Sequence, residues 1–344
     1  MTGETQFLDL PDGHLAYDDT GNGPLIVATP AMLDLRSELR YLVPLLVEAG
    51  FRVVTVDQRG MRESSATWPE YGSTPLALGL IALIRHLDAG PAIIYGTSNG
   101  AAAGVYVAAE QPELIAGLVL VAPFVRDGQR SWIQRRLLNI MRIPALTLPI
   151  YMSYFPQWEP RRPRAVDFDD HMAKLKANLS EPSRRKVVAA YVLQQTHREA
   201  EARLGRVKAP SLVVMGTADI DWPDPLAEAH WIVERLGSEL IVLDGAGHHP
   251  HVEYPHEIAA AVTGFAELLI PPYPEVRSTS PSAIAVGMAT SSVGTPESTP
   301  ASACPRAHPS FPAQQLYLAL TCTVATFHPP TVTTGERPCR SALR

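Results

Sequence analysis

The chain has 344 residues, a formal net charge of −6 and 46% hydrophobic residues. This mildly acidic balance, without a recognisable nucleic-acid-binding module, excludes nucleic acid as an expected partner. No stretch is long and apolar enough to span a bilayer, and the first residues lack the basic and apolar regions of a secretory signal. We therefore expect a cytoplasmic protein that does not bind membranes.

The most informative local pattern is Gly96-Thr97-Ser98-Asn99-Gly100, which joins a β-type apolar run at 92–95 to an Ala-rich helical run at 101–110. A serine between glycines at a strand-to-helix turn is typical of a nucleophile elbow, because Gly96 and Gly100 permit a sharp turn around an exposed Oγ. Taken alone, such a serine is as readily a small turn residue. A catalytic serine also needs a base and an orienting acid.

Asp219 and His248 follow Ser98 in the chain order that this elbow requires. The apolar runs at 211–216 and 240–243 are predicted strands, so both residues come just after carboxyl ends of strands, where open parallel sheets gather catalytic groups. We predict Ser98 as nucleophile, His248 as base and Asp219 as the acid that orients the imidazole.

The identity of the acid has alternatives within the same loop. Asp221 and Asp224 follow Asp219 closely, although the spacing from Gly216 favours Asp219. Asp224 is predicted to cap a helix that begins at Pro225, since an N-cap carboxylate before a first-turn proline is a common helix start.

Residues 124–208 differ in composition from the predicted strands on either side. They are arginine-rich, and apolar spacing at 175–179 and 187–193 predicts helices. We expect most of these arginines to be solvated or paired with Asp167, Asp169 and Asp170. Aromatic residues cluster around prolines here and either line a substrate pocket or form the segment's own core: Trp132, Tyr151, Tyr154, Phe155 and Trp158.

The remaining histidines are predicted to be surface or packing residues. The run from His248 to His251 suggests a metal site, but no second group at metal-binding spacing accompanies it, so we predict no metal. No cofactor is predicted either. His14, His86 and His171 stand singly in the sequence.

Residues 271–344 form a Pro-, Ser- and Thr-rich segment that we predict to be a disordered tail, because it cannot bury enough apolar surface to offset its ordering entropy. All three cysteines lie there, at positions 304, 322 and 339, and they form no evident disulfide framework. The predicted organisation is a catalytic core in two parts, 1–123 and 209–270, the insertion 124–208, and the tail.

These features together resemble the α/β-hydrolase superfamily from about residue 5 to residue 270, closest to its single-domain esterase and epoxide-hydrolase-like branch. Residues 10–24 are similar to the family's first hairpin, and residues 25–29 and 52–57 to its third and fourth strands. Asp57-Gln58-Arg59-Gly60 matches the first half of the family's D-x-R-G-x-G-x-S turn. The resemblance implies a mostly parallel eight-stranded sheet with helices on both faces and a helical cap inserted at 124–208.

The sequence departs from the family pattern in two loops. The family has His-Gly after its third strand, whereas this chain has Pro30-Ala31-Met32. Because backbone N–H groups form the family's oxyanion hole, the resemblance implies Met32 and Asn99 as the donors. The other departure, residues 61–64, is interpreted as altered loop packing. Some family members carry the acid after the sixth strand, which adds Asp127 as a candidate.

Serine at the elbow favours acyl chemistry, because epoxide hydrolases and haloalkane dehalogenases of this fold have aspartate there. We predict hydrolysis of a small ester or related acyl compound through an acyl-Ser98 intermediate, by a monomer or homodimer. A carbon–carbon bond hydrolase, an acyltransferase or a perhydrolase on the same triad remains open. A non-catalytic ligand-binding receptor on this fold is the alternative from another class.

Overall fold

A computed structural model describes residues 4–128 and 143–269. Its eight strands form one sheet in the order β1-β2-β4-β3-β5-β6-β7-β8. Strand β2 is antiparallel to both of its neighbours, and every other adjacent pair from β4 to β8 is parallel. The strands are β1 (Gln6–Leu10), β2 (Gly13–Thr20), β3 (Leu25–Thr29), β4 (Arg52–Val56), β5 (Ala92–Thr97), β6 (Ile115–Val121), β7 (Ser211–Gly216) and β8 (Glu239–Leu243).

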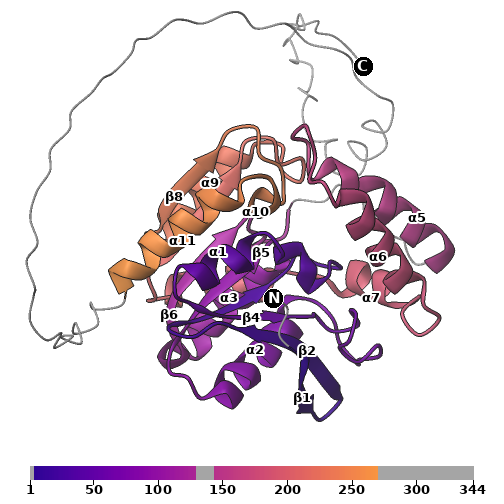
Figure 1. Ribbon diagram of the computed structural model, residues 1–344, viewed down its shortest axis with the longest axis horizontal. Coiled ribbons are helices and arrows are strands. Elements are labelled where there is room, and N and C mark those ends of the chain that lie inside the picture. The colour runs from indigo at the N-terminus through magenta and orange to yellow at the C-terminus, as the bar shows by residue number, and fades with distance from the viewer. Residues whose placement is uncertain (1–3, 129–142, 270–344) are drawn as a thin grey trace, which may run out of the picture.

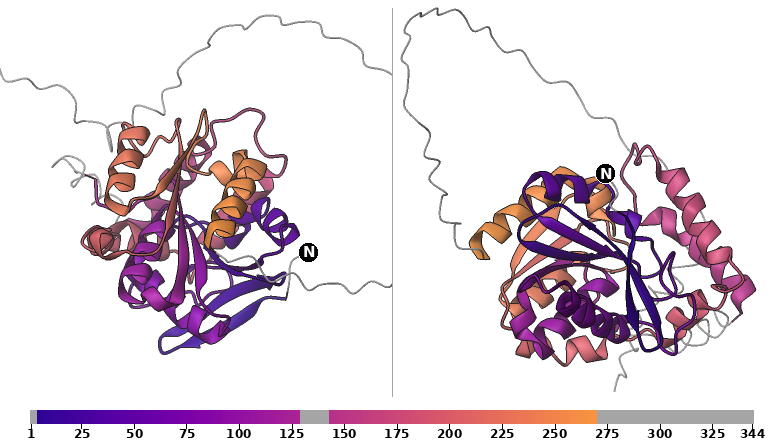
Figure 2. Two further views of the ribbon diagram at one scale, coloured as in Figure 1. Left: turned by 90° about the vertical axis from the view of Figure 1, so that its left-hand side faces the viewer. Right: turned by 60° about the horizontal axis from the view of Figure 1, so that its bottom comes forward.

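Helices cover both faces of this sheet, as Figure 2 shows. One face packs against α2 (Ser73–Leu87), α3 (Asn99–Glu110) and α9 (Pro225–Leu236). The other packs against α1 (Leu42–Glu48) and α11 (Pro255–Leu269). Short helical turns complete the body: η1 (Arg36–Leu39), η2 (Pro112–Leu114), α8 (Arg198–Glu201), η4 (Leu204–Arg206) and α10 (Pro250–Glu253). The predicted mostly parallel eight-stranded sheet with helices on both faces is confirmed.

The alternation of strand side chains explains why two helical layers are needed. In β5, Ile94 packs into the cluster beneath α2 and α3, whereas Ile93 and Tyr95 pack toward α1 and α11. All residues of β5 are buried. Central parallel strands are covered on both faces in this way, and their sequences are therefore continuous runs of apolar residues.

Among the described residues between β6 and β7, the longer helices gather at one end of the molecule (Figure 1). They are α5 (Pro144–Tyr154), α6 (Phe168–Ser180) and α7 (Val187–Gln194), with the turn η3 (Phe155–Gln157) after α5. The helical spacing noted at 175–179 and 187–193 falls within α6 and α7. These helices share a third apolar cluster with loops of the body, including Leu33 and Met61.

Residues proposed for catalysis follow the carboxyl ends of parallel strands, which meet at one edge of the sheet. Met32 follows β3, Ser98 follows β5, Asp219 follows β7 and His248 follows β8. Among the described residues, no helix combines the length and apolar character needed to cross a bilayer. The predicted tail and Trp132 lie outside the described residues.

Candidate active site

Ser98 occupies a strained turn between β5 and α3. Its backbone has φ 55° and ψ −112°, a conformation that side chains other than glycine rarely adopt. A Cβ at Gly96 would lie 2.4 Å from the carbonyl carbon of Gly100, and one at Gly100 would lie 2.6 Å from Thr29 Cγ2. Only glycine fits at either position, so the sequence pattern follows from close backbone packing around Ser98.

The same turn is fixed to the neighbouring strand by backbone hydrogen bonds. Ser98 N–H donates to the Val121 carbonyl over 2.8 Å, and Phe124 N–H donates to the Ser98 carbonyl over 3.2 Å. Ser98 is 7% exposed. The Phe124 ring in turn lies 5.9 Å from the His248 ring, centroid to centroid, so Phe124 contacts the serine turn through its backbone and the histidine through its ring.

His248 and Asp219 form a buried pair. His248 Nδ1 lies 2.8 Å from Asp219 Oδ2, which leaves Nε2 as the nitrogen that can exchange a proton with a substrate or a serine. Within the described residues, Ser98 Oγ makes no hydrogen bond to this imidazole. Catalytic hydrogen bonds are often long in free enzymes and shorten when substrate binds.

Two carboxyl groups act on the His248 imidazole. Burial lowers the pKa of His248, but attraction to the Asp219 and Asp221 carboxylates outweighs burial and raises the pKa above its ordinary value. Burial also raises the pKa of Asp221, although attraction to His248 opposes this. The two carboxylates thus stabilise the imidazolium that a general base becomes once it has taken a proton.

The other acid candidates lie in different surroundings. Asp221 Oδ2 is 3.4 Å from His248 Nδ1, and its Oδ1 accepts a hydrogen bond from the Tyr154 hydroxyl. Asp224 caps α9 by accepting from Ala227 N–H, as its sequence context indicated. Asp127 accepts from Thr196 Oγ1 and from His197 N–H, and these bonds lower its pKa although burial opposes them.

The loop after β3 carries the proposed oxyanion donor. The N–H groups of Met32 and Asn99 donate to no backbone carbonyl within the described part of the chain, and their role as oxyanion donors is a proposal. The Tyr151 hydroxyl donates to the Met32 carbonyl over 3.2 Å. Leu33 adopts a positive φ of 64°, which turns the chain sharply after Met32.

Gln58 supports this loop and was not identified as a functional residue from the sequence. Its Nε2 donates to the Pro30 carbonyl over 2.6 Å, and its Oε1 accepts a 3.4 Å bond from the Tyr191 hydroxyl. Gln58 is fully buried. Its position directly after Asp57, in the half-motif Asp57–Gly60, was the available signal, but the motif alone does not reveal which loop the side chain reaches.

The second departure from the family pattern is a packed loop. Met61 is fully buried and lies in the third apolar cluster. Ser64 Oγ donates to the Asp57 carbonyl over 2.8 Å and accepts from Ala16 N–H over 2.9 Å. The loop therefore replaces a small glycine turn with apolar and hydroxyl contacts.

The described aromatic candidates form a buried cluster that also contacts the active-site loops. Tyr151, Tyr154, Phe155 and Trp158 are each at most 8% exposed. The Trp158 ring lies 5.1 Å from the His248 ring, centroid to centroid. The Tyr154 hydroxyl donates to Asp221, in the loop after β7 that also holds Asp219. The cluster thus forms the core between the inserted helices and the body. Its use as a substrate pocket remains a proposal.

Ion pairs of the inserted segment differ from the expectation. Asp167 binds Arg40 of the body rather than an arginine of its own segment, and Asp170 pairs with Lys174. Arg126 pairs with Glu228 of α9. Arg161 contacts Glu253 differently, because its backbone N–H donates to the Glu253 carboxylate and its guanidinium to the Glu253 backbone carbonyl. Sequence reasoning considered partners within the segment, whereas the fold places it against charged groups of the body.

The three histidines that stand singly in the sequence are packing or surface residues, and one of them contacts a buried carboxylate. His86 is exposed on α2, and His14 Nε2 lies 2.9 Å from the Glu63 carbonyl oxygen. His171 is buried and lies 2.8 Å from Asp34 Oδ1 through its Nε2.

Comparison with known proteins identifies related sequences. The sequence profile described as the alpha/beta hydrolase family matches residues 29–261. A Mycobacterium tuberculosis protein that carries the name non-heme bromoperoxidase BpoC is 35% identical over 112 residues, which are 32% of this chain and 42% of that protein. The chain therefore aligns with less than half of that relative's length.

Two further relatives cover more of the molecule. The pimeloyl-[acyl-carrier protein] methyl ester esterase of Neisseria meningitidis is 24% identical over 225 residues, 59% of this chain and 84% of the esterase. The solved structure of a thermophilic esterase from Thermogutta terrifontis superposes with a TM-score of 0.65 at 22% identity, covering 77% of this chain and 99% of the esterase. At this identity the structural likeness shows the fold.

Proposed function

Because this chain belongs to the alpha/beta hydrolase family, we propose that it is a serine hydrolase that cleaves a small ester or related acyl compound. The observation that carries the proposal is the buried His248–Asp219 pair, 2.8 Å apart, at the edge of the sheet where the strained turn presents Ser98. The esterase names of relatives support the same reaction class.

In the proposed reaction, Ser98 Oγ attacks the substrate carbonyl carbon while His248 Nε2 takes the hydroxyl proton. The carbonyl oxygen becomes an oxyanion that accepts hydrogen bonds from the N–H groups of Met32 and Asn99. The carbon–oxygen bond to the alcohol then breaks, and the His248 imidazolium returns the proton to the leaving oxygen. Water, deprotonated by His248, attacks the acyl carbon. The bond to Ser98 Oγ then breaks, the acid leaves, and the His248 imidazolium returns the proton to Oγ.

The surroundings of each group suit these steps. Asp219 fixes the His248 tautomer with Nδ1 protonated and stabilises the imidazolium in a buried site where charge interactions are strong. Preorganised backbone donors need no rearrangement as the negative charge develops, and one such donor contributes about 3 kcal/mol. Gln58 and Tyr151 hold two carbonyl groups of the donor loop.

Other reactions of the same acyl-enzyme differ in what attacks it. An alcohol would give acyl transfer and hydrogen peroxide would give perhydrolysis; the name of the bromoperoxidase relative is the reason to test the latter. A carbon–carbon bond hydrolase would release a carbon leaving group instead of an alcohol. Incubating one activated ester with water, an alcohol or peroxide, and measuring the products, distinguishes the attacking groups, and a β-diketone substrate tests carbon–carbon cleavage.

A fluorophosphonate probe tests the proposed nucleophile. We expect stoichiometric labelling of wild-type protein on the peptide that contains Ser98, and no labelling of that peptide in Ser98→Ala. A folded His248→Ala variant serves as the control for activation and should label far more slowly. Failure of the wild-type protein to label, with its fold intact by circular dichroism, would support the non-catalytic receptor instead.

A further inference from the structure

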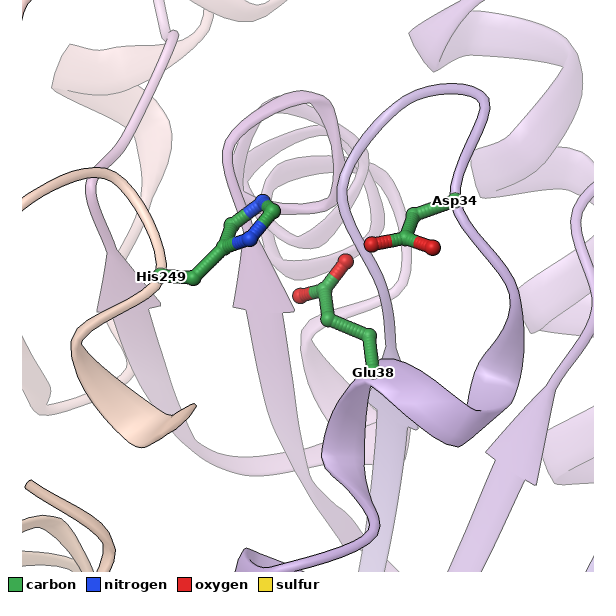
Figure 3. Close-up of side chains that lie close together, drawn as sticks. All are labelled: Asp34, Glu38 and His249. Atoms are coloured by element: carbon green, nitrogen blue, oxygen red, sulfur yellow. The ribbon is translucent and has the colours of Figure 1, made fainter. Parts of the chain in front are cut away.

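A second group of ionisable side chains lies beside the histidine loop, apart from Ser98. Asp34 comes from the loop after β3, Glu38 from η1, and His249 directly follows His248. Figure 3 shows the two carboxyl groups and the imidazole turned toward one another. Each residue offers one ligand atom, these atoms lie within 4.8 Å of one another, and all three residues are buried.

Each of the three side chains is held by a partner on its outer atom. Asp34 Oδ1 lies 2.8 Å from His171 Nε2 and accepts from Leu35 N–H over 2.7 Å. Glu38 Oε2 accepts from Ala31 N–H over 2.8 Å. His249 Nδ1 lies 3.4 Å from Glu159 Oε1. Metal-binding histidines and carboxylates are oriented by outer partners of this kind.

The opposite atom of each side chain makes no hydrogen bond among the described residues, although Glu38 Oε1 lies 2.9 Å from His251 Nε2. These atoms are Asp34 Oδ2, Glu38 Oε1 and His249 Nε2. An unsatisfied polar atom in a protein interior carries a substantial free-energy cost, and a group of them calls for an ion or ordered water. Asp34, Glu38 and His249 offer ligand atoms within 4.8 Å of one another, and each also carries an unsatisfied buried atom, so one cation held by the three side chains would offset this cost.

We propose that Asp34, Glu38 and His249 bind a divalent cation, with Zn²⁺ as the best match to one imidazole and two carboxylates. His251 offers a fourth donor, because its unpartnered Nε2 lies 2.9 Å from Glu38 Oε1. The cation would neutralise two buried carboxylates and link the Met32 loop to the loop that carries His248. Its role is structural and does not depend on the proposed hydrolysis.

The sequence alone favoured no metal because the histidine run lacked a second group of ligands. The fold supplies that group from residues 34 and 38, more than two hundred positions away along the chain. Spacing within the histidine run therefore could not reveal it. The active-site residues Asp219, Asp221 and His248 also lie within ligand distance of one another, so the experiment must separate the two locations.

Equilibrium dialysis of the chelator-stripped full-length protein against zinc, with metal counted by mass spectrometry, tests the site. We expect one zinc per chain in the wild type and loss of this binding in Glu38→Gln and His249→Gln. The matched control Asp221→Asn should retain it. His171→Asn, which removes only the outer partner of Asp34, should weaken binding roughly 10- to 100-fold. Zinc at a hundredfold excess over Kd should raise the wild-type Tm by roughly 5 to 10 °C.

A wild type that binds no stoichiometric zinc would overturn the proposal. So would loss of zinc in Asp221→Asn with retention in Glu38→Gln, which would place the metal in the active site. Should the ligand variants fail to fold, anomalous diffraction from zinc-loaded wild-type crystals decides the question. A peak between Asp34, Glu38 and His249 supports the site, and its absence there refutes it.

Discussion

The backbone N–H of His248 donates to the carbonyl oxygen of Trp158 over 2.9 Å. This hydrogen bond joins the inserted segment directly to the loop that holds the proposed base, and the two rings lie 5.1 Å apart, centroid to centroid, with their planes tilted by 33°. The contact is possible because Gly247 lets the two backbones approach closely. A Cβ on Gly247 would lie 2.1 Å from the Trp158 carbonyl oxygen and 2.3 Å from Pro160 Cδ.

Gly247→Ala should therefore impair both stability and turnover. We expect a loss of at least about 2 kcal/mol in the free energy of unfolding, the cost of a backbone clash in a packed region. The control is Gly264→Ala on α11, where an added Cβ meets nothing within 4 Å and should stabilise the protein by roughly 0.5–1 kcal/mol. Denaturant unfolding measures the stability of both variants, and ester turnover is measured on the same two proteins. Equal stability of the two variants would contradict the close approach.

Substitutions of the acid candidates should rank by their contact with His248. Asp219→Asn should lower kcat by about 10⁴, because an amide favours the wrong imidazole tautomer. Asp221→Asn should cost less than about tenfold, since its oxygen lies farther from Nδ1. Asp127→Asn should stay close to the wild type. Near-normal turnover in Asp219→Asn with loss in Asp127→Asn would move the acid to the loop after β6.

The contact between Asp167 and Arg40 should make stability depend on pH. Hydrogen bonds from Arg40 lower the pKa of Asp167 from 3.8 to about 2, although partial burial opposes them. A depressed carboxyl pKa stabilises the fold above the ordinary value, and this contribution is lost as pH falls from about 4 to about 2.

Melting curves of wild type and Asp167→Asn test this linkage. The wild type should be more stable near neutral pH by a few degrees at most, because the pair is partly exposed and screened by solvent. The difference should shrink as pH falls through that window. A difference in Tm that is the same at pH 6 and pH 3 would show that the charge of Asp167 does not stabilise the fold.

Local patterns in the sequence predicted the strands that precede Ser98, Asp219 and His248. The predicted strand at 211–216 coincides with β7, because buried parallel strands are continuous apolar runs bounded by turns. The strand at 25–29, expected from the family resemblance, coincides with β3. The turn around Ser98 was predictable for a similar reason, since its two glycines are required by contacts within a few residues.

Contacts between distant segments were not predictable in the same way. Gln58 reaches the Pro30 carbonyl, and Asp167 reaches Arg40, through side chains whose partners depend on the packing of separate elements. The proximity of Asp34 to His249 depends on the meeting of two loops at one edge of the sheet. Contacts of this kind leave no periodic pattern in the sequence, so they cannot be predicted from a single sequence.

The central claim is that Ser98 carries the acyl group during turnover. Rapid quenching of the wild-type protein with an activated acetate ester, followed by peptide mass spectrometry, measures this directly. The account predicts one acetyl group on the Ser98 peptide within the first turnover, and Ser98→Ala should retain well under a tenth of the wild-type rate. Steady turnover while the Ser98 peptide stays unmodified would contradict the covalent mechanism. So would turnover in Ser98→Ala that equals the wild-type rate.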